Sequence, residues 1–206
     1  LPEAMLNYLA RLGWSHGDDE LFSRQQLVEW FDGTHLSKSP AQWDPAKLAW
    51  VNAHYMKQAD DSRLARLLDG QLVRRGIHVA ADEAMHQRIA LFKDRCATVV
   101  ELADWLQMFY VAKVEPGADD RALVTDAIKP ALRDLQAALA EAPWQPAGIM
   151  QSIKATLAQH NLKLPQLAIP LRVLVCGRSQ TPAIDAVLAL FPRDVVMSRL
   201  SDGLAA

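Results

Sequence analysis

The amino-acid sequence predicts an all-α fold, and three observations support this prediction. Apolar residues recur at helical spacing along almost the whole chain. Residues that favour helix starts and stops bracket these stretches. Strand and helix patterns do not alternate as they do in proteins with a parallel sheet. One stretch disagrees, because Leu171–Cys176 has the composition of a short buried strand, and a run of this length is ambiguous by period alone.

Start and stop signals define the individual helices. Proline suits the first helical position, because its missing N–H would have no partner within the helix there. Ser23 with Gln26, and Thr98 with Glu101, have the spacing of a capping box. Glycines at positions 13, 33 and 76 are expected to end the helices that they follow. In chain order, the expected helices begin at or near Pro2, Ser23, Pro45, Leu64, Ala81, Thr98, Asp119, Pro130, Pro146, Pro182 and Pro192.

Composition and charge limit the class of protein. The chain has 206 residues, half of them hydrophobic, which is enough for one large domain or two small ones. A net charge of −2 argues against an indiscriminate nucleic-acid binder. The charge is uneven: residues 1–60 hold five Lys or Arg against eight Asp or Glu, and residues 145–206 hold six against three. An anionic ligand is therefore expected near the C-terminal end.

The length of the apolar runs and the number of cysteines indicate the cellular compartment. No apolar run is long enough to span a bilayer, and no signal peptide is recognised. Two cysteines are too few for a disulfide framework. These features favour a reduced, cytoplasmic setting without contact to a membrane.

The sequence contains no recognised motif for catalysis or for binding a phosphate or a metal. There is no Gly-rich phosphate loop and no Gly-x-Ser-x-Gly elbow, and the six histidines do not fall at zinc-ligand spacing with the cysteines. We therefore expect no catalytic, cofactor-binding or metal-binding residue. His54 is interpreted as a satisfied or exposed helix histidine, Cys96 as a buried thiol, and most of the six tryptophans as core. One helix carries four arginines that fit either a phosphate backbone or a solvated face, namely Arg63, Arg66, Arg74 and Arg75.

Four segments together resemble one family. They are Leu1–Ser15, Trp43–Tyr55, Lys93–Val99 and Pro170–Ile184. In this order and at these separations, they are similar to the C-terminal half of bacterial glutamate–tRNA ligases, which belong to the class I aminoacyl-tRNA synthetases. This half comprises the stem-contact and anticodon-binding region of the family.

The resemblance implies an architecture and a division of the chain. It implies a helical bundle or cage of two consecutive anticodon-binding modules, over residues 61–143 and 144–206, preceded by a helical stem-contact segment over residues 1–60. In this family the stretch Leu171–Cys176 is helical.

The resemblance also implies which parts of a ligase to expect here. The His-rich turn of class I ligases is absent, and Leu36–Ser39 only superficially resembles their ATP-binding Lys-Met-Ser-Lys-Ser loop, because the family's loop lies upstream of the segment that Leu1–Ser15 matches. We therefore interpret Leu36–Ser39 as a polar loop and expect this chain alone to be inactive. ATP and Mg²⁺ belong to the catalytic half, the implied partner is glutamate-specific tRNA, and a monomer is expected.

Particular residues take on roles through the resemblance. Arg95 matches an arginine that contacts the third anticodon base, and Arg172 matches one placed against another anticodon base. Thr181, Pro182 and Ile184 match a small turn on which a splayed base rests, although the family usually has Leu or another apolar residue in place of Ile184. These roles suit RNA recognition, which mainly reads unstacked loop bases.

The residues themselves add three expectations about this loop. Gly177 permits a turn that a side chain would hinder, and Arg178 adds positive charge beside it. Thr181-Pro182 reads as an N-cap and first helical residue, which would leave free N–H groups facing the loop.

Two alternatives stay open. Arg95 and Arg172 also fit ordinary surface salt bridges, and the whole chain also fits a free-standing helical adaptor that binds proteins. Within the ligase interpretation, some bacterial enzymes charge only glutamate-specific tRNA and others also charge glutamine-specific tRNA. The arginine at position 95 favours the strict type.

Overall fold

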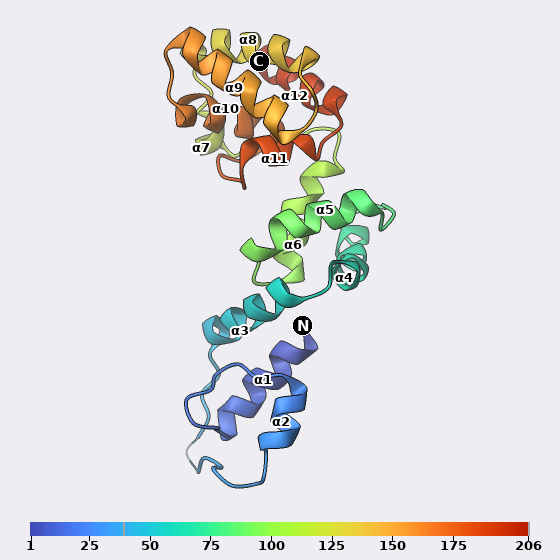
Figure 1. The fold of residues 1–206 in the computed structure, drawn as a ribbon, viewed down its shortest axis with the longest axis vertical. Helices are drawn as coiled ribbons and strands as arrows, with labels where there is room; N and C mark the ends of the chain where they lie inside the picture. The colour runs from blue at the N-terminus through green and yellow to red at the C-terminus, as the bar shows by residue number, and fades with distance from the viewer. Residues whose placement is uncertain (39, 206) are drawn as a thin grey trace. The chain divides into compact units, whose positions relative to one another are not determined.

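The computed structural model describes residues 1–38 and 40–205, and no β-strand forms in this part of the chain. The helices gather into two compact units, Leu1–Trp105 and Leu106–Ala206 (Figure 1). The all-α prediction is therefore confirmed.

Most helices of the first unit start at acidic or hydroxyl caps. Ser23 and Gln26 form the predicted capping box, and the Asp44 carboxylate accepts hydrogen bonds from the N–H groups of Ala46 and Lys47. Such caps satisfy first-turn N–H groups that have no partner within the helix. The helices are α1 (Pro2–Gly13), α2 (Arg24–Trp30), α3 (Pro45–Gln58), α4 (Asp61–Val73), α5 (Glu83–Phe92), the 3₁₀ turn η1 (Lys93–Arg95) and α6 (Val99–Leu106).

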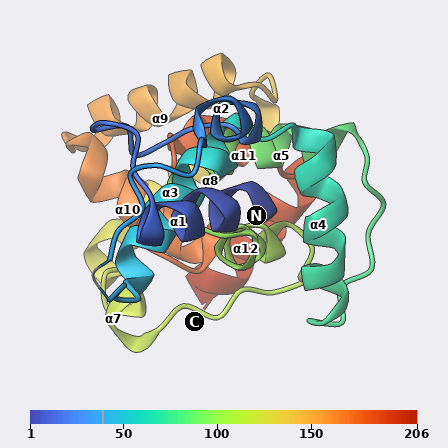
Figure 2. The same ribbon diagram turned by 90° about the horizontal axis from the view of Figure 1, so that it is seen from below.

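Two pairs of helices carry most of the packing in this unit. α1 packs along α3, as Figure 2 shows, and α4 packs on α5. The α4–α5 pair buries a set of fully inaccessible apolar side chains: Leu64, Leu68, Leu72, Met85, Ile89 and Phe92. Each such side chain contributes about 1.5–3 kcal/mol relative to leaving it in water.

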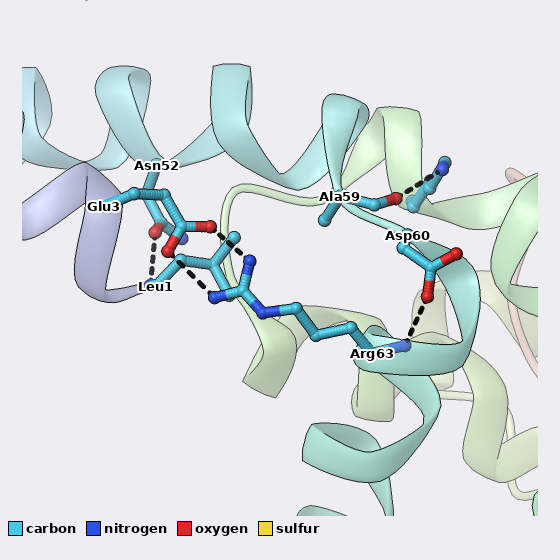
Figure 3. Close-up of polar contacts among 7 residues, drawn as sticks. Leu1, Glu3, Asn52, Ala59, Asp60 and Arg63 are labelled. Carbon is cyan, nitrogen blue, oxygen red and sulfur yellow. Dashed lines mark hydrogen bonds and ion pairs between the residues drawn. The ribbon is translucent and has the colours of Figure 1, made fainter. Parts of the chain in front are cut away.

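A polar junction ties α1 to α3 and α4 (Figure 3). Both guanidinium N–H₂ groups of Arg63 bind the Glu3 carboxylate, at 2.5 and 2.8 Å. This hydrogen-bonded pairing lowers the pKa of Glu3. The Leu1 nitrogen donates to Asn52 Oδ1 at 2.6 Å, and the Asn52 amide in turn donates to the carbonyl of Ala97. A bidentate arginine fixes orientation as well as distance, so the first helix is held in one position against the next two.

A lysine connects η1 to the turn between α3 and α4. Lys93 Nζ donates to the Ala59 carbonyl at 2.9 Å and pairs with Asp61 Oδ1 at 2.8 Å. The side chain of Lys93 is largely buried at this point. The 3₁₀ turn is thereby fixed on the same framework as the helices around it.

The second unit packs its helices around one apolar core. α8 contacts α9 and α12, α10 contacts α12, and α9 contacts α11 (Figure 1). The core includes Leu132, Leu135, Ile153, Leu171, Val187 and Leu200, each with no exposed surface. The elements are η2 (Gln107–Phe109), α7 (Ala118–Arg121), η3 (Asp126–Ile128), α8 (Lys129–Glu141), α9 (Pro146–His160), α10 (Leu164–Cys176), α11 (Ile184–Ala189) and α12 (Arg193–Ala205).

Most of the expected helix boundaries agree with these elements. Leu171–Cys176 is helical and forms the end of α10, as the family resemblance implied. Thr98 Oγ1 accepts from the Glu101 N–H as predicted, but the Glu101 carboxylate returns to the N–H of Ala97 rather than to that of Thr98. The prediction that a helix starts at Pro182 was wrong, because α11 begins at Ile184.

The predicted division into three modules stays a prediction. Its boundaries, after residues 60 and 143, fall in the connections between α3 and α4 and between α8 and α9. The two compact units instead meet at residues 105 and 106.

Two helical glycines are expected to respond oppositely to alanine. A Cβ on Gly148 in α9 would collide with the backbone carbonyl of Pro143, whereas a Cβ on Gly70 in α4 would meet no atom within 4 Å. Gly148→Ala should therefore destabilise the protein by about 1–3 kcal/mol. Gly70→Ala should stabilise it by up to about 1 kcal/mol, because alanine is the better helix former. Urea unfolding followed by circular dichroism measures both, and equal effects of the two substitutions would contradict this packing.

Candidate nucleic-acid interface

The loop after α10 turns sharply at its first residue. Gly177 has φ of +74°, and its N–H donates to the Val173 carbonyl at 3.0 Å. A Cβ at this position would also lie 3.0 Å from Val114 Cβ. Both the left-handed backbone and the close neighbour favour glycine here. Residues 177–183, which we call the α10–α11 loop, then lead to α11.

A hydroxyl anchors an arginine across this loop. Arg172 Nε donates to Thr181 Oγ1 at 3.0 Å, and the Thr181 hydroxyl donates its own proton to the Pro182 carbonyl at 2.8 Å. Because a hydroxyl has one donor and two acceptor positions, it can hold both groups at once. Arg172 is half-buried in this position. The guanidinium plane is therefore oriented by the loop and not by solvent.

One expectation about this loop was wrong. Thr181 is not the N-cap of α11, because the helix starts at Ile184 and its N-cap position is Ala183, which makes no side-chain cap. The Thr181 hydroxyl is instead engaged by Arg172 and by the Pro182 carbonyl. The helix therefore starts two residues later than predicted, at Ile184.

Two of the predicted contact residues lie inside the unit. Pro182 is buried, and Ile184 is 2% exposed. Both side chains are therefore covered by the rest of the second unit. The accessible residues of the loop are Arg178, Ser179 and Thr181, which are half-buried, and Gln180 and Ala183, which are exposed.

Arg95 belongs to the first unit, where it is the last residue of η1. Its side chain is exposed, whereas its neighbours are fixed: Cys96 is buried, and Lys93 is bound to the α3–α4 turn. Arg95 therefore projects from a rigid backbone. The structure joins Arg172, near the end of α10, to Thr181 in the loop that starts at Gly177, whereas Arg95 stands on a different element of a different unit.

A buried arginine supports the loop, and the sequence reasoning missed it. Arg199 of α12 is 5% exposed, and its guanidinium donates to the carbonyls of Val175, Met108 and Val111 at 2.5, 2.9 and 2.7 Å. Desolvation by burial lowers the pKa of Arg199. The signal that could have found it is its place on the apolar stripe of α12, beside Val196 and Leu200.

Both cysteine thiols are buried, and His54 has a polar neighbour on its own helix. Cys96 is buried as predicted, and burial raises the pKa of its thiol to about 12. Burial likewise raises the pKa of Cys176 to about 12. A thiol that remains protonated at neutral pH is a poor nucleophile. His54 faces Gln58 along α3, with their nitrogens 3.1 Å apart, and is thus a satisfied helix histidine.

The tryptophans and the arginine-rich helix depart partly from expectation. The interpretation of most tryptophans as core was wrong, because only Trp14 is buried and Trp43 and Trp50 are about half exposed. Of the four arginines expected on one helix, Arg63 and Arg66 lie in α4, whereas Arg74 and Arg75 follow its last residue, Val73. Arg63 and Arg75 pair with the carboxylates of Glu3 and Asp104, and the other two arginines are exposed.

No helix in the described residues is long and apolar enough to cross a membrane.

In the second unit, an all-helical domain holds the guanidinium of Arg172 in α10 against a short loop. Residues 47–204 match the family described as the anticodon binding domain, and the chain belongs to this family. The predicted resemblance to glutamate–tRNA ligases is likewise confirmed. The glutamate–tRNA ligase of Burkholderia multivorans is 57% identical over the whole of this chain, and that of Leptothrix cholodnii is 55% identical over 97% of it.

These relatives are longer than the chain, which spans 44% and 43% of their lengths. Among solved structures, the glutamate–tRNA ligase of Elizabethkingia meningosepticum superimposes on the whole chain with a TM-score of 0.90, over 41% of its own length. The enzyme of Elizabethkingia anophelis does so with a TM-score of 0.86. Both are 21% identical in sequence, so these two matches support the fold alone.

Replacing the buried arginine should destabilise the second unit strongly. Arg199→Met leaves three carbonyls without their charged donor, and hydrogen bonds to charged groups contribute about 1.5–3 kcal/mol each. We expect a loss of about 3 kcal/mol or more in the free energy of unfolding, measured by urea denaturation. Arg133→Met, at an exposed position of α8, is the matched control and should change stability little. Similar losses for both variants would contradict the supporting role of Arg199.

Proposed function

We propose that this chain recognises the anticodon of a transfer RNA, and that the α10–α11 loop is its principal base-reading surface. The observation that carries the proposal is the arginine held by the threonine hydroxyl, Arg172 Nε to Thr181 Oγ1 at 3.0 Å, within the residues that match the anticodon-binding family. Local charge supports it, because Arg172 precedes the loop and Arg178 lies in it, on a chain whose net charge is −2. The negative net charge keeps non-specific attraction to RNA weak.

The geometry of Arg172 favours hydrogen bonds to the edge of a base over non-specific attraction to the charged RNA backbone. Arginine presents a planar fork that can pair with two acceptors on one base edge, which lysine cannot do. A fork held by a second side chain loses less rotational freedom on binding. The left-handed turn at Gly177 redirects the backbone immediately after α10 and starts the loop that carries Thr181.

The similarity to glutamate–tRNA ligases supports a narrower version of the proposal. The RNA would be glutamate-specific tRNA, and the chain would serve an enzyme that attaches glutamate to it with ATP. ATP and Mg²⁺ would then bind in the part of such an enzyme that this chain does not match. A cytoplasmic location and a monomeric state belong to the same proposal.

Anticodon-dependent binding tests the proposal directly. The chain should bind glutamate-specific tRNA more tightly than the same tRNA with a replaced anticodon in a gel-shift titration at fixed salt. Arg172→Ala should weaken cognate binding several-fold, since a bidentate contact to a base contributes about 1–3 kcal/mol. Thr181→Val should also weaken it by releasing the guanidinium, whereas Thr181→Ser keeps the hydroxyl and should bind like the unsubstituted chain.

Thermal unfolding separates this effect from misfolding, because none of these three substitutions should lower the melting temperature by more than a few degrees. Equal binding of the two tRNAs by the unsubstituted chain would contradict the proposed function.

Arg95 is expected to select the third anticodon base, which distinguishes glutamate- from glutamine-specific tRNA. Arg95→Gln should relax that selection by about 1–3 kcal/mol while leaving the helices folded. Competition binding with the two tRNAs measures the ratio of affinities. Arg133→Gln, at an exposed position outside the proposed interface, should leave the ratio unchanged. The same ratio for Arg95→Gln and for the unsubstituted chain would exclude this role.

A further inference from the structure

The second unit contains a positively charged cleft that the proposed function does not use. It measures about 420 Å³ and lies between α10, α12 and the segment that runs from η2 to the start of α8. Four basic residues and one acidic residue contribute to its lining: Lys113, Arg121, Lys129, Arg199 and Asp202. The remaining walls are mostly apolar, and they include Val114, Val173 and Leu174.

The buried cation in this lining has no carboxylate partner among the described residues. Arg199 binds only carbonyl oxygens through its terminal nitrogens, and its Nε is buried without a hydrogen-bond partner. Its charge is therefore not neutralised locally. Inside a poorly solvated wall, an unneutralised charge acts over a longer range than it would in water.

The other cations are held only weakly by the protein itself. Lys113 pairs with Asp202 at 3.0 Å, but these side chains are 77% and 51% exposed. Lys129 is mostly covered and pairs with Asp126, which is 95% exposed and does not line the cleft. Arg121 makes a 3.3 Å contact to the Pro116 carbonyl. Exposed ion pairs contribute little to stability, so a ligand with more negative charge can replace these partners.

The cleft adjoins the base-reading loop. Val114, in its wall, is the residue against which a Cβ on Gly177 would press. Val173 and Leu174, also in the wall, directly follow Arg172 along α10. An RNA strand with one base at the α10–α11 loop thus has its backbone within reach of this cleft.

We propose that the cleft binds a phosphate group of the RNA backbone next to the base held at the α10–α11 loop. This inference rests on the proposed function and extends it. Lys129 and Arg121 bind the phosphate oxygens, and Arg199 contributes its charge from the wall. The negative charge of Asp202 opposes binding of the phosphate. The contact carries no sequence information, because it is made to the backbone.

Salt dependence with two RNAs provides the test. The 206-residue chain is titrated with an anticodon stem-loop, and with the same stem-loop carrying a replaced anticodon, at several salt concentrations. Lys129→Gln and Arg121→Gln should each weaken both complexes by the same several-fold factor. Each should also reduce the slope of log K against log salt by about 0.7, the value for one phosphate contact in a single strand. Arg172→Ala, in contrast, should weaken only the cognate complex.

Two further variants sharpen the test. Asp202→Asn should strengthen both complexes, since it removes the only carboxylate in the lining. Lys154→Gln removes an exposed lysine of α9, outside the cleft, and should change neither affinity nor slope. A residue that acted only on folding would not produce a gain in one variant and a loss in the others.

Inorganic phosphate distinguishes the source of the phosphate. Its addition should shift the amide NMR signals of Val114 and Gly203, and Lys129→Gln should reduce the shifts. If phosphate binds in this way but Lys129→Gln leaves RNA binding unchanged, the site takes free phosphate and the RNA assignment is overturned. If neither probe responds to Lys129→Gln, there is no phosphate site. If Lys129→Gln weakens two RNAs that the unsubstituted chain does not distinguish, the proposed function fails and this site stands.

Discussion

The guanidinium of Arg199 holds together the three segments on which the loop after α10 depends. It joins the end of α10, at Val175, to two carbonyls of the segment around η2, at Met108 and Val111. Desolvating a cation is unfavourable, and three short hydrogen bonds offset that cost. Burial lowers the pKa of Arg199, but the delocalised guanidinium of arginine stays charged in proteins. The end of α10 is thus fixed where Gly177 must turn, and a wall of positive potential is created in the same place.

In the proposed interface, the groups that would position a strand are separate from the group that would read it. Cations lining the cleft can attract a backbone of any sequence, whereas Arg172 is held by Thr181. Arg172 directly precedes Val173 and Leu174 of the cleft wall, so both surfaces share α10. A base and its phosphate would therefore be bound with a fixed offset.

A structural feature could be predicted from the sequence where the residues that form it are close together in the chain. The capping residues Ser23 and Asp44 bind N–H groups two or three residues away, and both helix starts were predicted correctly. Thr181 carried an equally good local signal, yet its hydroxyl was taken by Arg172, nine residues earlier in the chain. The supporting role of Arg199 could not be predicted from its neighbours in the sequence, because one of its hydrogen-bond acceptors lies 91 residues away. The loop could thus be located from the sequence, but its internal geometry and its support could not.

The number of basic residues near the C-terminal end was also a poor guide to the positive charge that a ligand can reach. Residues 145–206 hold six basic residues, which suggested a surface attractive to anions. Two of these bind backbone carbonyls instead: Arg199 as described, and Arg193, which donates to Ala140 and Ala142 at the end of α8. A cation at a helix C-terminus stabilises the helix by meeting its unpaired carbonyls and its dipole. The charge that a nucleic acid can meet is therefore smaller than the count: Lys154 and Lys163 are exposed, and Arg172 and Arg178 are half-buried at the α10–α11 loop. A chain of slightly negative net charge can still bind an anion tightly if its few accessible cations converge on one place, and such a chain discriminates better because the rest of its surface does not compete.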